Sequence, residues 1–92
     1  MPATTLLVRY SGMVQGVGFR ATARRLAQAY DLKGWVKNEG DGSVTMVVHG
    51  STAEVDAFLR DIRESRLGPM IDREVLEPQS GPMTLEAFGI RH

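Results

Sequence analysis

A glycine-rich stretch at residues 12–20, Gly-Met-Val-Gln-Gly-Val-Gly-Phe-Arg, is the feature that most constrains the fold. It lies between a strand-like segment and a helix-like segment. Glycine allows the backbone to turn its N–H groups inward and allows a ligand to approach closely. The N-terminus of a helix adds unpaired N–H groups and a partial positive charge. We therefore predict an anion-binding loop here, with phosphate as its most common kind of occupant.

Arg20 stands at the predicted start of the helix that follows the loop. The helix dipole disfavours a cation in the first turn by about 0.3–1 kcal/mol. An anion held between this arginine and the loop explains the placement. The predicted phosphate-binding loop acts mainly through its backbone, and Gln15 is expected to act only through its backbone N–H. Its residues are Gln15, Gly16, Val17, Gly18, Phe19 and Arg20.

The composition is that of a folded protein, and the length of 92 residues predicts a single domain spanning residues 1–92. Hydrophobic residues make up 42% and charged residues 24%, which argues against disorder. Eleven cationic and eleven anionic side chains give a formal net charge of zero. Proteins that bind nucleic acids usually carry a basic excess, so we expect no nucleic-acid partner.

Several site classes are excluded or disfavoured by the residues present. The chain has no cysteine, which excludes disulfides and thiolate metal sites. The two histidines, His49 and His92, are too few and too far apart in sequence to suggest a metal site, and we expect them to be structural or incidental. We therefore expect the protein to bind no metal and no cofactor. No apolar run is long enough to span a membrane, and the N-terminal residues do not resemble a signal peptide. We expect a cytoplasmic monomer that does not associate with membranes.

The hydrophobic periodicity predicts an α+β fold with the element order β-α-β-β-α-β and a short extra strand. One helix is predicted at 20–30, and a second opens at 51–54, where the sequence has capping-box spacing. The order is that of the split β-α-β, or ferredoxin-like, sandwich, with two helices on one face of a mostly antiparallel sheet. The predicted strands are residues 5–11, 33–38, 43–49, 72–77 and 84–90.

This topology brings Arg20 and Asn38 to one end of the sheet. Strands 5–11 and 33–38 run parallel, joined by a right-handed crossover, with strand 43–49 between them. Their C-terminal ends therefore share one rim, about 10 Å apart. The glycine loop leaves the first of these ends and Asn38 closes the second. We predict that the two side chains face a common pocket.

A pocket with these two side chains supports only a few types of reaction. Arginine offers a planar fork that matches two phosphate oxygens, whereas Asn38 can hold a water molecule but cannot act as a strong base. Phosphoryl transfer through a loose transition state depends mainly on positioning and charge stabilisation. Without a general acid it needs a good leaving group. An acyl phosphate supplies one, because a carboxylic acid has a pKa of about 4.

Three segments together resemble acylphosphatases: Ser-Gly-Met-Val-Gln-Gly-Val-Gly-Phe-Arg at 11–20, Gly-Trp-Val-Lys-Asn at 34–38 and Asp-Gly-Ser-Val at 41–44. The closing Phe-Gly-Ile-Arg-His is similar to the end of that family's sequences. The resemblance implies a small cytoplasmic enzyme that hydrolyses acyl phosphates to a carboxylate and inorganic phosphate without a cofactor. It implies that Arg20 binds the phosphate and that Asn38 orients the attacking water.

Asp31 departs from the family pattern, which usually has glycine just after the first helix. If this position needs a left-handed backbone, aspartate adopts it less easily than glycine, and we expect a small loss of stability.

Two other functions stay open at this stage. One is a non-catalytic module that binds phosphate or acyl phosphate without hydrolysing it. The other is an RNA-binding ferredoxin-like domain, which the zero net charge and the few aromatic residues disfavour.

Overall fold

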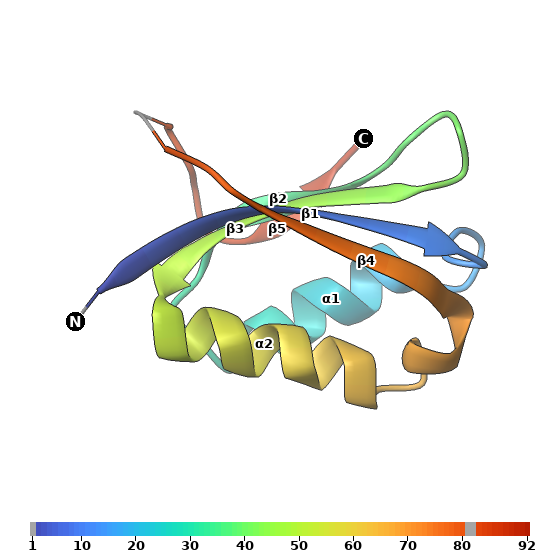
Figure 1. The fold of residues 1–92 in the computed structure, drawn as a ribbon, viewed down its shortest axis with the longest axis horizontal. Coiled ribbons are helices and arrows are strands. Elements are labelled where there is room, and N and C mark those ends of the chain that lie inside the picture. The colour runs from blue at the N-terminus through green and yellow to red at the C-terminus, as the bar shows by residue number, and fades with distance from the viewer. Residues whose placement is uncertain (1, 81–82) are drawn as a thin grey trace.

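The computed structural model describes residues 2–80 and 83–92, and its two helices lie on one face of a five-stranded sheet (Figure 1). This is the predicted ferredoxin-like α+β architecture. The helices are α1 (Phe19–Ala27) and α2 (Thr52–Glu64), and a 3-10 turn, η1 (Gly68–Met70), follows α2. The strands are β1 (Ala3–Gly12), β2 (Lys33–Asn38), β3 (Val44–Ser51), β4 (Ile71–Pro78) and β5 (Gly89–Arg91).

The strand order across the sheet is β4-β1-β3-β2-β5. The predicted placement of β3 between β1 and β2 is confirmed, and β3 is antiparallel to both. Val8 and Val36 both lie opposite Met46, so the three side chains form one row across the central strands. β1 and β2 therefore run parallel, and their C-terminal ends meet at one rim.

The core lies between the sheet and the two helices. Alternation in β1 turns Val8 and Tyr10 inward, and both are fully buried. The apolar faces of both helices also pack inward, although Leu26 and Tyr30 are only partly buried. The helix residues buried in this core are Phe19, Ala23, Ala27, Val55, Phe58, Leu59 and Ile62.

The end of the first helix differs from the expectation. α1 stops at Ala27 rather than near residue 30, and the chain continues in turns in which Tyr30 N–H donates to the Ala27 carbonyl at 3.0 Å. The Tyr30 hydroxyl donates to an Asp61 carboxylate oxygen at 2.5 Å. This contact directs the tyrosine toward α2, where it packs at the edge of the core.

Asp31 does not adopt the left-handed conformation, because positive φ values among the described residues occur only at glycines. Its N–H donates to Glu54 Oε2 at 2.9 Å, near the predicted cap of α2. That cap is confirmed, since the Ser51 hydroxyl accepts from Glu54 N–H at 3.2 Å. The backbone reason for expecting a loss of stability at Asp31 is therefore wrong.

The C-terminal part of the chain also differs from the expected boundaries. The last strand is β5 at Gly89–Arg91 instead of residues 84–90, and it pairs in parallel with β2. Before it, Ala87 forms an isolated bridge to Lys33, and Gly34 N–H donates to the Glu86 carbonyl at 3.0 Å. Irregular pairing along the edge of β2 explains the shorter strand. The sequence also predicts a turn at residues 78–82, which lie partly outside the described residues. No helix in the described part of the chain is long and apolar enough to cross a membrane.

Candidate active site

Arg20 and Asn38 line the same cavity, as the topology predicted. The cavity has a volume of about 240 Å³ and lies at the rim where β1 and β2 end. The β1–α1 loop and the β2–β3 turn both lie at this end of the sheet (Figure 1). Both side chains are half-buried. The lining residues are Val14, Gly16, Gly18, Phe19, Arg20, Ala21, Asn38, Ile90 and His92.

The glycine loop leads directly into α1 and leaves the helix N-terminus open. Gly18 is the N-cap residue and adopts a left-handed conformation, with φ 75° and ψ 27°. Among the described residues no side chain caps this end, and the first turn has no acidic residue. The Gly18 carbonyl accepts the first helical hydrogen bond from Thr22 N–H at 3.0 Å. The N–H groups of the first turn are thus free to bind an anion in the cavity.

Gln15 fastens the loop to the neighbouring turn through its side chain. Its Nε2 group donates to the carbonyl of Glu39 at 2.7 Å and to that of Ser43 at 2.9 Å. The expectation that Gln15 acts only through its backbone is therefore wrong. The two hydrogen bonds connect the glycine loop to the turn that begins directly after Asn38, so they hold the two sides of the cavity together. Nothing in the local sequence around Gln15 indicates these contacts.

The β2–β3 turn is stabilised by Asp41. Its Oδ1 accepts from Ser43 N–H at 2.9 Å and from the Ser43 hydroxyl at 2.6 Å. The side-chain hydrogen bond and then the backbone hydrogen bond from Ser43 hold the pKa of Asp41 below its usual value. The turn is also closed by Glu39 N–H, which donates to the Ser43 carbonyl at 2.9 Å.

Arg20 also contacts the C-terminal strand, which the sequence did not indicate. Its Nη1 lies 3.3 Å from His92 Nδ1 and 3.5 Å from the Arg91 carbonyl oxygen. His92 was expected to be structural or incidental, but it lines the cavity beside Arg20. Parallel pairing of β5 with β2 places these residues, distant in sequence, at the same rim. The residue pattern within a single segment does not indicate a contact between segments so distant in sequence.

A second arginine, Arg66, contacts the glycine loop without lining the cavity. Arg66 follows α2, and its Nη1 donates to the Val17 carbonyl at 2.8 Å. Its Nη2 donates to Thr22 Oγ1 at 2.9 Å, in the first part of α1. Val17 does not line the cavity, whereas Gly18 does. The sequence around Arg66 does not indicate these contacts.

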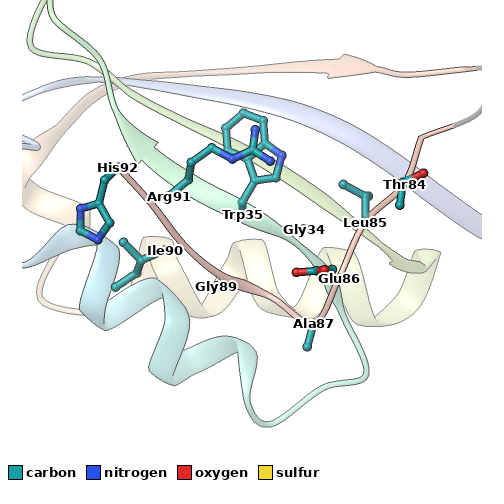
Figure 2. Close-up of a pocket in the computed structure, with 10 residues that line it drawn as sticks. All are labelled: Gly34, Trp35, Thr84, Leu85, Glu86, Ala87, Gly89, Ile90, Arg91 and His92. Carbon is teal, nitrogen blue, oxygen red and sulfur yellow. The ribbon is translucent and has the colours of Figure 1, made fainter.

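A larger cavity, of about 530 Å³, lies beside β2 and β5 and is shown in Figure 2. Trp35 is half-buried there, and the Arg91 guanidinium lies 4.4 Å from the centre of its ring. Ile90 and His92 line both cavities. The larger cavity contains neither Arg20 nor Asn38, so we take the smaller cavity as the candidate site. In residues 2–80 and 83–92, no group of three or more histidine, aspartate or glutamate residues is placed to hold a metal ion.

The fold and the rim cavity define a class of protein. It is a small ferredoxin-like sandwich in which a glycine loop, an arginine at a helix start and an asparagine at a strand end surround one cavity.

The acylphosphatase family profile matches residues 6–90. The chain is 37% identical to the acylphosphatase of Burkholderia lata over 91% of this chain and 86% of that one. It is 34% identical to the acylphosphatase of Salinibacter ruber over 90% of this chain and 87% of that one. The crystal structure of acylphosphatase from Bacillus subtilis has the same fold, with a TM-score of 0.87, 24% identity and coverage of 99% of this chain and 100% of that one.

The chain belongs to the acylphosphatase family. Acylphosphatases are hydrolases that act on acyl phosphates, with the acyl phosphate as substrate and phosphate as product. The family and the activity predicted from the sequence motifs are thus confirmed.

Proposed function

We propose that this chain hydrolyses acyl phosphates in the rim cavity, with Arg20 binding the phosphate and Asn38 orienting the attacking water. The observation that carries the proposal is that both side chains line one cavity together with the start of α1. Arg20 supplies a charged fork for two phosphate oxygens. Asn38 supplies an amide that can accept from water while it donates to another oxygen.

The backbone of residues 15–20 is proposed to bind the remaining phosphate oxygens. Gly18 has the left-handed conformation that opens the helix N-terminus, and no side chain of the helix occupies these N–H groups. The partial positive charge there adds to that of Arg20. A phosphate dianion would offset the unfavourable position of an arginine in the first helical turn. The glycine loop, the N-terminus of α1 and Arg20 would then all bind the same phosphate.

The reaction is proposed to proceed without a strong base from the protein and without a cofactor. The carboxylate leaving group departs without a proton, because its conjugate acid has a pKa of about 4. Catalysis then consists of holding the water in line and stabilising charge on the phosphoryl oxygens. Since all the proposed groups belong to this one chain, we propose that the monomer is active. The absence of cysteine fits a reducing compartment such as the cytoplasm.

The experiment that tests the proposal is a benzoyl phosphate hydrolysis assay in the presence of EDTA, with wild-type protein and the Asn38→Ala variant. If Asn38 positions the water, the variant should lose about 10²–10³-fold in kcat. Its phosphate affinity, measured by calorimetry, should stay close to that of the wild type. Full turnover by Asn38→Ala would remove Asn38 from the mechanism. Phosphate binding by the wild type without any hydrolysis would instead indicate a non-catalytic module.

A further inference from the structure

Arg66 contacts the glycine loop and does not line the cavity. It lies between α2 and η1, and its two terminal nitrogens bind the Val17 carbonyl and the Thr22 hydroxyl at 2.8 and 2.9 Å. Thr22 is buried, although Arg66 as a whole is exposed. A Cβ atom added to Gly18 would lie 3.1 Å from Arg66 Nη2, so the guanidinium packs directly against this glycine. The arginine thus contacts the peptide between Val17 and Gly18.

The geometry of that peptide couples Arg66 to the cavity. All described peptide bonds are trans, so the Val17 carbonyl and the Gly18 N–H point in opposite directions. The carbonyl is directed to Arg66 on one side. The N–H of Gly18 is therefore directed away from Arg66, and Gly18 lines the cavity. Fixing the carbonyl fixes the direction of the N–H.

The loop sequence by itself does not enforce this orientation. Gly18 has a φ of 75°, but glycine adopts negative φ about as readily as positive φ. The peptide can therefore rotate at little cost to the glycine. A rotated peptide would present the Val17 carbonyl oxygen to the cavity in place of an N–H. An oxygen acceptor there would repel a phosphate oxygen.

We propose that Arg66 is a positioning residue, which holds the Val17–Gly18 peptide so that the Gly18 N–H faces the bound phosphate. This inference rests on the proposed function, because it assumes that phosphate occupies the rim cavity. Arg66 itself does not contact the phosphate. Its contribution is to keep a hydrogen-bond donor directed at the anion before the anion binds.

The test compares four variants by phosphate calorimetry, by kcat and KM for benzoyl phosphate, and by denaturant unfolding. Arg66→Met should weaken phosphate binding by about 10-fold or more, and raise KM by a similar factor, because a donor is lost from the cradle. Arg66→Lys should recover part of the affinity, since an ammonium group can still donate to the Val17 carbonyl. Thr22→Val should lose stability but bind phosphate nearly as well as wild type. Arg25→Met, an exposed arginine on α1, removes the same charge and should change affinity by less than about twofold at 0.15 M salt.

Wild-type phosphate affinity in a folded Arg66→Met protein would overturn this inference while leaving the proposed function intact. An equal loss of phosphate affinity in Arg25→Met would also overturn it, because the loss would then follow from the change in net charge. A wild-type protein that binds no phosphate would overturn both proposals. A measurement on the wild type alone covers the case in which Arg66→Met does not fold. The Gly18 amide proton should shift strongly downfield in NMR spectra as inorganic phosphate is added, and an unchanged Gly18 amide at saturation would overturn the inference.

Discussion

At the scale of single residues, the proposed chemistry depends on the shape of Arg20 as well as on its charge. The guanidinium is held at the rim by contacts to His92 Nδ1 and the Arg91 carbonyl, so its direction is set from outside the loop. A fork that is already oriented can bind two oxygens of one phosphate. This distinguishes binding by Arg20 from simple attraction to a positive charge.

Arg20→Lys tests that distinction, because it keeps the charge and removes the fork. We expect phosphate, measured as a competitive inhibitor of benzoyl phosphate hydrolysis, to bind about 10-fold more weakly or worse. The substitution changes few buried atoms, so the unfolding midpoint should change little. If phosphate inhibits Arg20→Lys at the same concentration at which it inhibits the wild type, the planar geometry of Arg20 is unimportant for binding.

At the scale of elements, the cavity depends on how the β1–α1 loop is fastened to the β2–β3 turn. Gln15 forms this connection with two hydrogen bonds to backbone carbonyls. Its replacement by leucine leaves both carbonyls without this donor, and we expect a loss of about 1–3 kcal/mol in the free energy of unfolding. The same change should raise KM, because the two walls of the cavity are no longer tied. Unchanged unfolding and KM would mean that water replaces the amide at no cost.

Gly34 sets how closely β2 approaches β3. A Cβ atom at this position would lie 1.9 Å from the Val47 carbonyl oxygen, and the φ of 138° is unfavourable for any other residue. Gly34→Ala must therefore displace β2, which ends at Asn38. We expect a loss of stability of more than about 3 kcal/mol in urea unfolding. Gly40→Ala is the matched control, since a Cβ atom there meets nothing within 4 Å. Equal stability of the two variants would contradict this account of the strand pair.

Asp41 makes the stability of the same turn depend on pH. Hydrogen bonds from Ser43 lower its folded pKa below the unfolded value of about 3.9. Its stabilisation is therefore fully present above the unfolded pKa and is lost as pH falls through the lower folded pKa. The carboxylate is exposed, so the effect should be small. In thermal unfolding from pH 6 to pH 2, Asp41→Asn should show a shallower acid-induced decrease in Tm than wild type, and parallel curves would exclude a role for Asp41.

At the scale of the whole molecule, the sequence was sufficient to predict the elements whose apolar residues recur at regular spacing. Alternation in β1 and the helical stripes predicted the element order, and the topology then placed Arg20 and Asn38 at one rim. The sequence could not indicate the side-chain contacts of Gln15, nor those of Arg66 and His92, because each of these contacts joins distant segments and the partner is often a backbone carbonyl. A carbonyl is present at every position, so it leaves no pattern in the sequence.

Ligand binding should also be visible in the stability of the whole molecule. A phosphate that binds only the folded state stabilises it by about 2.7 kcal/mol at a concentration of 100 times Kd. We expect inorganic phosphate to raise the Tm of wild type and of Asn38→Ala alike, and that of Arg20→Lys much less at the same concentration. The comparison uses sulfate-free buffer at constant ionic strength. Equal increases in all three proteins would indicate a salt effect rather than binding at the rim.

The proposed mechanism requires one phosphate to lie between Arg20 and Asn38, and a crystal structure of the phosphate complex would show its position. We expect phosphate in the cavity of about 240 Å³, with two of its oxygens on the Arg20 fork and others on backbone N–H groups of the glycine loop. The Asn38 amide should then face the phosphorus across a water molecule. Phosphate bound instead in the larger cavity beside Trp35 and Arg91, with the glycine loop empty, would contradict the account.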